Sequence, residues 1–230
     1  MRTHAAAQLI GDRSHQCDAT ATYTHGATRA YALLDGIGSS DAVRVWTHTT
    51  ARRLARAAAI RDSAEAGLRA VHAVAAAERA RRRTPSAVAV VAVAAPGQRL
   101  QIAWCGDARA YLLTGDRLWR LTKDHNKRQV LIDLGRTPDP YDRNTVTSYL
   151  GDTCDEPQIG TCTVPQRGRL LLASDGAYEP LEDAGEDLAD YLAGSPRRAA
   201  RTLTAAAIEF APSHADNATT LVADLGAPGR

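Results

Sequence analysis

Three aspartates lie beside runs of apolar residues, where a carboxylate could take part in chemistry. Asp35 and Asp175 each follow such a run and are each followed by a glycine, and Asp216 precedes one. Carboxylates where buried strands give way to turns point into water, and three of them converging in one fold would make a hard, oxygen-rich cation site. The sequence therefore predicts a divalent-cation site built from distant parts of the chain.

The composition of the chain is that of a globular protein. It has 230 residues, of which 44% are hydrophobic and 23% are charged, enough to bury a full core. The 28 Lys and Arg residues against 26 Asp and Glu give a net charge of +2, which does not argue for nucleic acid as a partner. No linker, repeat or low-complexity tract divides the chain, so we expect a single domain spanning residues 1–230.

Several features predict a cytoplasmic protein with no membrane partner. The N-terminus lacks the apolar core of a secretory signal, and no stretch reaches roughly 18 uninterrupted apolar residues. Cys17, Cys105, Cys154 and Cys162 form no C-x-x-C pair, so we expect reduced thiols and no zinc site. The many alanines and the preference for arginine over lysine indicate a bacterial source.

The strands that must position the aspartates are short apolar or alternating runs bounded by turn residues. We expect them at about 5–10, 19–23, 29–34, 86–93, 100–105, 110–113, 118–121, 161–164, 170–173 and 219–223. The strands from 86 to 113 are predicted to form an antiparallel meander, and residues 114–117 to form a hairpin turn.

Apolar residues at helical spacing predict two long helices from Asp41 to about Arg82, broken near Asp62 and Ser63. A short helix is expected at about 127–134, and a helical block at about 187–192 and 196–210, the latter starting at Ser195. Because strands come in runs interrupted by paired helices, the pattern favours an α+β layered architecture over a doubly wound parallel sheet.

Six short motifs resemble, in order, those of the metal-dependent protein phosphatases of type 2C, also called PPM-type. They lie at residues 11–18, 34–38, 105–112, 121–126, 174–176 and 216–219, so the resemblance covers nearly the whole chain. It implies a four-layer α-β-β-α sandwich, in which two central antiparallel sheets are flanked by helix pairs. It also implies a variable flap at about 126–149 beside the active site.

The resemblance also assigns metal ligands. It implies that Asp35 bridges two Mn²⁺ or Mg²⁺ ions and that the Gly36 carbonyl binds one of them. Asp175 and Asp216 resemble ligands of the other ion, and Asp107 resembles a ligand of a third, looser ion. Two such ions sharing a water would generate hydroxide at neutral pH and clamp a phosphate for in-line attack.

Three further residues support this implied site. Arg13 resembles the arginine that binds the substrate phosphate, a task for which its planar fork is suited. Asp18 and Asn217 would contact the ligands rather than the ions. The implied activity is that of a bacterial protein serine/threonine phosphatase, with phosphorylated proteins as substrates and a serine/threonine kinase as counterpart.

The chain departs from the family pattern at Cys17, where family members usually carry a glutamate. A thiol is a poor partner for manganese or magnesium, so one alternative is a pseudophosphatase, a phosphoprotein-binding or regulatory module with weak or no turnover. Another is a phosphatase specialised for the phosphoserine switch proteins of sigma-factor control. Ile37 stands where animal relatives carry a histidine, and Ser39 replaces the second glycine of a Gly-Gly pair.

Structural interpretations compete at several positions. An Asp-Gly pair at a strand end is usually a turn, and for Asp107 the ligand and turn interpretations stay open. For Asp124 and His125 we expect a structural turn with its hydrogen bonds satisfied rather than a catalytic role. We interpret Cys17 as a small, partly buried replacement rather than as a redox-sensitive thiol. We expect Arg79 and residues 81–83 to form a solvated helix end rather than a nucleic-acid site.

Overall fold

The computed structural model describes residues 3–82, 84–153, 158–211 and 214–226. Arg83 and Cys154 lie outside these ranges, and so do the predictions made for them. Within the described residues, no helix is both long and apolar enough to cross a membrane.

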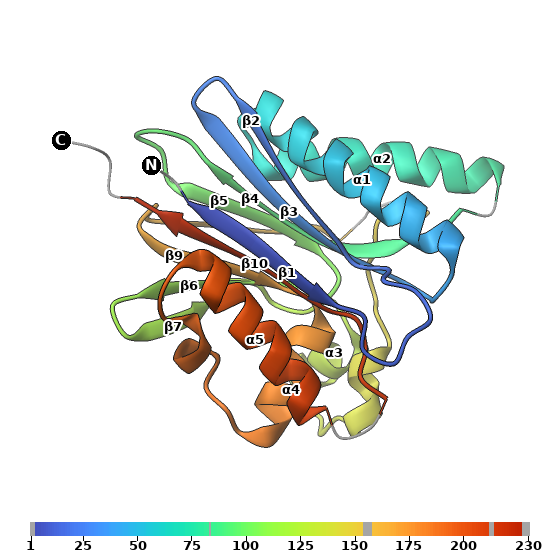
Figure 1. Cartoon of the computed structure of the whole chain (residues 1–230). Helices are drawn as coiled ribbons and strands as arrows, with labels where there is room; N and C mark the ends of the chain where they lie inside the picture. Colours follow the sequence, from blue (N-terminus) through green and yellow to red (C-terminus); the bar gives the residue numbers. More distant parts are fainter. Residues whose placement is uncertain (1–2, 83, 154–157, 212–213, 227–230) are drawn as a thin grey trace.

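Two antiparallel sheets of five strands form the centre of the molecule (Figure 1). One sheet contains, in spatial order, β1 (His4–Leu9), β10 (Ala218–Leu225), β9 (Gly168–Ala173), β6 (Arg109–Thr114) and β7 (Arg117–Arg120). The other contains, in spatial order, β2 (Ala19–His25), β3 (Thr28–Gly36), β4 (Ala87–Ala94), β5 (Leu100–Cys105) and β8 (Gly160–Val164).

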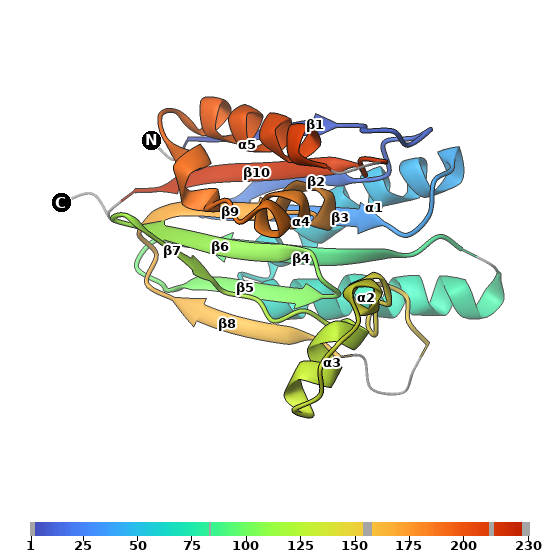
Figure 2. The same cartoon turned by 90° about the horizontal axis from the view of Figure 1, so that it is seen from below.

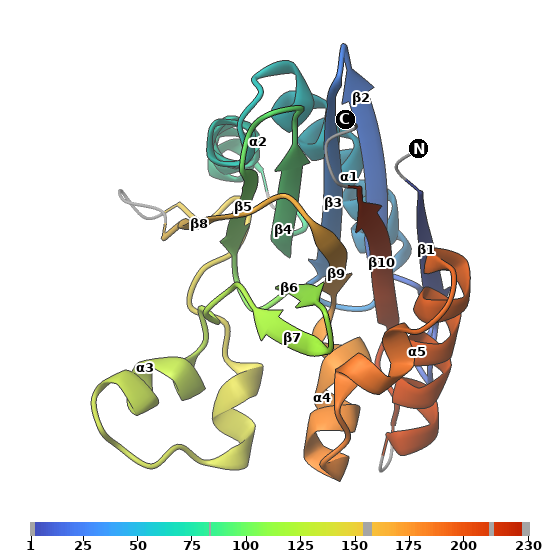
Figure 3. The same ribbon diagram turned by 90° about the vertical axis from the view of Figure 1, so that its left-hand side faces the viewer.

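A pair of helices covers the outer face of each sheet, which confirms the predicted α-β-β-α sandwich. Helices α1 (Asp41–Ile60) and α2 (Ala64–Arg81) lie on the β2-to-β8 sheet, and α4 (Asp175–Ala184) and α5 (Pro196–Phe210) lie on the other (Figures 1 and 2). The short helices α3 (Lys127–Asp133) and η1 (Pro140–Asn144) project to one side of the sandwich (Figure 3).

Strand β4 shows how the sequence builds these layers. All eight of its residues are buried. Alternate side chains of a strand point to opposite faces of a sheet, so both faces of β4 must be covered. Val88 and Val90 pack in the core between the two sheets, whereas Val91 and Val93 pack with the residues under α1 and α2. An uninterrupted apolar run therefore marks a strand covered on both faces.

The predicted helix boundaries near serine residues are confirmed. The hydroxyl of Ser63 accepts from the Ala66 N–H at the start of α2, and that of Ser195 accepts from the Arg198 N–H at the start of α5. Between α1 and α2 the chain turns at Asp62, whose φ of +52° is unusual for a non-glycine residue. This turn is the break expected at Asp62 and Ser63.

The predicted meander from 86 to 113 is wrong in its last step. Strands β4 and β5 pair as expected, but β6 leaves for the other sheet and pairs with β7 and β9. Gly106 lies at this crossing with a φ of +97°, and a Cβ there would come within 2.1 Å of the Val88 side chain. Glycine therefore allows the chain to change sheets here.

The helical block predicted at 187–192 is a short 3-10 helix, η2 (Leu188–Leu192), and α5 packs against both η2 and α4. Helix α4 was missed because Gly176 and Pro180, both poor helix formers, lie within it.

Candidate active site

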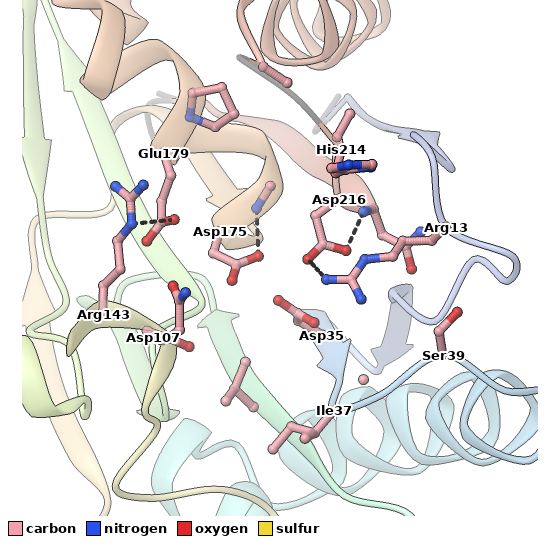
Figure 4. A pocket seen from close by; sticks show the side chains of 18 of the residues that line it. Arg13, Asp35, Ile37, Ser39, Asp107, Arg143, Asp175, Glu179, His214 and Asp216 are labelled. Atoms are coloured by element: carbon pink, nitrogen blue, oxygen red, sulfur yellow. Dashed lines mark hydrogen bonds and ion pairs between the residues drawn. The ribbon is translucent and has the colours of Figure 1, made fainter. Parts of the chain in front are cut away.

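A pocket of about 490 Å³ lies where β3 ends, α4 begins and the chain enters β10. Figure 4 shows the side chains that point into it. Its lining includes six of the predicted ligand and phosphate-binding residues, together with Asn217. The six are Arg13, Asp35, Gly36, Asp107, Asp175 and Asp216. The structure therefore brings together residues that are up to about 200 positions apart in the sequence.

The three aspartates reach the pocket from three different kinds of backbone. Asp35 lies within β3, where it pairs with Val88 of β4. Asp175 is the first residue of α4, and its carboxylate accepts a hydrogen bond of 2.5 Å from the Gly176 N–H. Asp216 lies in the loop two residues before β10. The expectation that all three stand at strand–turn boundaries is thus wrong for Asp175, which begins a helix.

Burial and mutual repulsion dominate the electrostatics of the pocket. Burial raises the pKa of Asp35 well above its usual value, and the neighbouring Asp175 carboxylate raises it further. The pKa of Asp175 is raised by burial and then by Asp216. Burial, with a contribution from Asp175, raises the pKa of Asp107 to about 7. Without a cation, these carboxylates cannot all be charged at neutral pH.

Asp18 lies behind the pocket lining and has the least satisfied carboxylate. It is 1% exposed, and neither of its oxygens has a hydrogen-bond partner. Burial raises the pKa of Asp18 to about 8, although the nearby Thr219 hydroxyl offsets part of the rise. A buried carboxylate without donors is costly unless a proton or a cation neutralises its surroundings.

Asn217 ties the N-terminal loop to the entrance of β10. Its Oδ1 accepts from the Cys17 N–H at 2.7 Å, and its Nδ2 donates to the Ile10 carbonyl at 2.8 Å. It therefore holds in place the loop that carries Arg13 and Asp18.

Arg13 is paired with one of the predicted ligands. Its guanidinium contacts the Asp216 carboxylate at 2.5 Å, and the other oxygen of Asp216 accepts from the Asn217 N–H at 2.7 Å. About half of the Arg13 side chain is exposed, so its head lies at the mouth of the pocket. Each oxygen of Asp216 thus accepts one hydrogen bond and keeps a second lone pair for another partner.

The donor set suits a hard divalent cation in its chemistry. It consists of carboxylate oxygens and the Gly36 carbonyl, and Asp18 adds an unsatisfied carboxylate behind them. In their present positions, however, no three His, Cys, Asp or Glu side chains of the described residues come close enough together to hold one ion. The predicted ligands therefore line one pocket, but their side chains are not close enough to one another to coordinate a single ion.

Three charged residues of the pocket, Glu179, Arg143 and Asp183, were missed from the sequence. Glu179 of α4 forms an ion pair of 3.2 Å with Nε of Arg143, and the fork of Arg143 binds Asp183 at 2.7 and 2.8 Å. Burial raises the pKa of Glu179 to about 8. Asp175, Glu179 and Asp183 are spaced four residues apart, so they share one face of α4. That spacing would have identified Glu179 and Asp183 had the helix been recognised.

Cys17 does not line the pocket. Its side chain is 2% exposed, and Sγ lies 3.7 Å from the Ser40 carbonyl oxygen, toward the start of α1. Burial raises the pKa of the Cys17 thiol, which keeps it protonated at neutral pH. The departure from the family pattern therefore places a neutral, buried thiol next to Asp18.

A buried network around Arg109 holds the pocket's supporting elements together. Arg109 is 3% exposed and binds Asp124 through two nitrogens, at 3.0 and 2.7 Å. It also binds Glu182 of α4 at 2.8 Å and lies 3.7 Å above the Tyr178 ring, whose hydroxyl donates to the Asp107 carbonyl.

This network confirms the structural interpretation of Asp124 and His125. Asp124 has a second arginine partner in Arg120, and His125 Nδ1 accepts from the Gly106 N–H at 3.3 Å. Both side chains therefore hold the turn that follows β7.

The metal-free protein is expected to lose stability as the pH rises from about 4 to about 8. The pKa of Asp18 is raised from 3.8 to about 8, so over this interval the folded state holds a proton that the unfolded chain has released. The free energy of unfolding therefore decreases as the pH rises. Urea unfolding in a chelator at a series of pH values measures the trend, and Asp18→Asn should make it less steep, because the other carboxylates with raised pKa values still contribute. A free energy of unfolding that increases across this interval would contradict the assignment.

Comparison with known proteins identifies relatives of this architecture. The family model described as "Protein phosphatase 2C" matches residues 9–130. The serine/threonine protein phosphatase PstP of Mycobacterium tuberculosis is 31% identical over an alignment of 141 residues that covers 59% of this chain and 27% of PstP. The match thus spans about a quarter of the length of that curated relative.

Solved structures share the fold over nearly their full length. The crystal structure of M. tuberculosis PstP/Ppp superposes with a TM-score of 0.77 at 27% identity, covering 98% of this chain and 99% of that one. The PstP catalytic domain in complex with two manganese ions gives 0.74 at 26% identity, covering 97% of each chain. PppA of Pseudomonas aeruginosa gives 0.79 at 24% identity, covering 98% of each chain.

Proposed function

This chain belongs to the protein phosphatase 2C family, and from that membership we infer that it is a metal-dependent protein serine/threonine phosphatase. The observation that carries the proposal is the convergence of four aspartates and Arg13 in one pocket. The four are Asp35, Asp107, Asp175 and Asp216. We propose that the whole chain, residues 1–230, is a single domain of this family.

Two Mn²⁺ or Mg²⁺ ions are the proposed cofactor. In this proposal Asp35 contacts both ions, Gly36 contacts one through its carbonyl, Asp175 and Asp216 contact the other, and Asp107 serves a third. When bound, such ions make a coordinated water nucleophilic at neutral pH and neutralise phosphate charge. The solved PstP complex with two manganese ions and the all-oxygen donor set of this pocket support the choice of metal.

Arg13 is proposed to bind the substrate phosphate. Its guanidinium already holds one carboxylate oxygen of Asp216, and a phosphate presents the same geometry to the planar fork. Asp18 and Asn217 stay behind this surface, Asp18 as buried negative charge and Asn217 as the tie between the N-terminal loop and β10.

The proposed substrates are proteins phosphorylated on serine or threonine, with a serine/threonine kinase as counterpart and neither nucleic acid nor membrane as partner. The projecting segment at about 126–149, which carries α3 and η1, is proposed as the flap that shapes access to the pocket, because Arg143, Asn144 and Val146 line it. A cytoplasmic location in a bacterium fits the free thiols of Cys17, Cys105 and Cys162.

Hydrolysis of a small aryl phosphate and of a phosphothreonine peptide, titrated with Mn²⁺, tests the proposed activity. We expect the wild type to hydrolyse both substrates in proportion to bound manganese and to lose the activity in a chelator. Cys17→Ser is the matched control, and it should keep the activity because the thiol points to the Ser40 carbonyl and not into the pocket.

The comparison with Cys17→Glu decides between an enzyme and a pseudophosphatase. A wild type without manganese-dependent turnover, together with recovery in Cys17→Glu, would contradict the proposed function. It would show that the replaced acidic residue is required for catalysis.

A further inference from the structure

The outer seam between α1 and α2 carries an open groove, away from the pocket described above. Two adjoining cavities of about 370 and 540 Å³ share four lining residues, so they form one continuous trough. The shared residues are Trp46, Thr50, Arg53 and Glu78. We call this trough the α1–α2 groove. Figure 1 shows that these two helices form the outermost layer on their side of the sandwich.

The floor and walls of the α1–α2 groove are apolar. Val71 and Ala75 of α2 are buried at its base, whereas Val45, Ile60 and Val74 are 52%, 39% and 51% exposed along its sides. On α1 the lining residues recur every three or four positions from residue 42 to residue 60, which places them on one face of the helix. A 20-residue helix is about 30 Å long, so the groove offers an apolar track of roughly that length.

The surroundings of the groove are strongly basic. Residues 41–82 contain nine arginines and four carboxylates, a net charge of +5 in a chain whose total is +2. Arg53, Arg56, Arg61 and Arg82 all line the groove. Among the described residues, no carboxylate lies within ion-pair distance of Arg56, Arg61 or Arg82.

Two carboxylates do line the groove, and both are already paired. Glu78 faces Arg53 across the groove at 3.8 Å, and Asp41 is held by Arg44 at 2.6 Å. The remaining positive charge is therefore available to a partner.

We propose that the α1–α2 groove binds an amphipathic helix of a partner protein, with an apolar face for the floor and acidic residues on its flanks. Apolar side chains of such a helix would cover Val74 and Ile60, in the helix-in-groove mode of recognition. Its carboxylates would meet the unpaired arginines at the rim, which provides orientation and specificity. Nucleic acid would match the charge but would leave the apolar walls uncovered. The proposal does not depend on the proposed phosphatase activity.

A designed pair of peptides tests this docking site. Both are helical peptides of about 20 residues with leucines on one face; one carries glutamates on its flanks and its twin carries lysines. Fluorescence anisotropy with the full chain measures their affinities. We expect the affinity of the glutamate peptide to be at least about tenfold higher than that of the lysine twin, and to fall with added salt.

Two groove variants and one matched control locate the binding. Arg53→Glu/Arg56→Glu reverses the charge at the rim, and Val74→Glu places a charge on the apolar wall. Each variant should bind the glutamate peptide about tenfold more weakly than the wild type does. Because all three side chains are at least partly exposed, these variants should fold. Arg201→Glu, an exposed arginine on α5, should leave the affinity unchanged.

Four results would overturn the proposal. Equal affinity for the two peptides would show that charge complementarity does not drive binding. Unchanged affinity for the glutamate peptide in both groove variants would show that it binds elsewhere. Tighter binding of a nucleic-acid duplex that is blocked by Arg53→Glu/Arg56→Glu would make the groove a nucleic-acid site. A concentration-dependent dimer in sedimentation, abolished by Val74→Glu, would show that a second copy of this chain occupies the groove.

Discussion

Replacing Asp35 by asparagine is expected to reduce manganese-dependent turnover by more than about 100-fold and to stabilise the metal-free protein at the same time. Loss of partners outside a metal's ligands costs about 10- to 100-fold, so loss of the proposed bridging carboxylate should cost more. The stability gain follows from burial beside Asp175, which raises the pKa of Asp35 well above its usual value. An amide of the same size needs no proton to become neutral.

The gain in stability is expected as a rise in Tm, because at neutral pH the folded wild type must either keep a proton on Asp35 or hold its buried charge next to Asp175. Thermal unfolding in a chelator measures it at neutral pH. With Mn²⁺ present the wild type should have the higher Tm, because only the wild type gains stability from bound ions.

The matched control for Asp35→Asn is Asp116→Asn, which changes an exposed carboxylate in the turn between β6 and β7 and should alter neither Tm nor turnover. Wild-type turnover in Asp35→Asn would refute its assignment as a ligand. A lower Tm without metal would show that the carboxylate of Asp35 is already stabilised by the protein itself.

Arg109→Leu is expected to cause the largest loss of stability among the substitutions considered. Arg109 is almost fully buried and is the partner of both Asp124 and Glu182. Removing one member of a buried ion pair leaves the other without compensation and costs about 3–5 kcal/mol. Asp124 keeps Arg120 as a partner, so the lower part of this range is expected. The corresponding fall in Tm is roughly 6–12 °C.

Urea unfolding of three variants tests the role of Arg109. The double variant Arg109→Met/Asp124→Leu replaces the pair by apolar groups and should recover most of the lost stability. Arg117→Leu removes an arginine that is stacked 3.6 Å above the Trp119 ring at the surface, and it should cost under about 1 kcal/mol. A loss in Arg109→Leu no larger than that in Arg117→Leu would mean that the buried pair contributes little.

Local patterns identified most of the fold because they report which faces of an element are covered. The apolar run at 86–93 became a strand buried on both sides, and the helical spacing from Asp41 to Arg82 became α1 and α2. The change of sheet after β5 could not be predicted in this way. Gly106 turns the chain in either case, and the strands that receive β6 are β7 and β9, which come later in the sequence.

The site was predicted from the order of motifs rather than from the local sequence around any one residue. That order gathered Asp35, Asp175, Asp216 and Arg13, which now lie in one pocket. It gave no sign of the pair between Arg13 and Asp216, because a contact across 203 positions depends on how the two ends of the chain meet. Arg143 was missed for the same reason, since its partners lie on a helix that the sequence obscured.

The two ends of the chain are joined in the fold, because β10 lies between β1 and β9 and Asn217 holds the loop that follows β1. A growing chain that has not yet reached residue 216 has neither the inner strand of that sheet nor the last pocket aspartate. During synthesis the N-terminal strand must therefore wait for its neighbour until β10 has left the ribosome. The pocket is thus completed only after residue 216 has emerged, and a chain cut before that point would carry most of the motifs without a working arrangement of them.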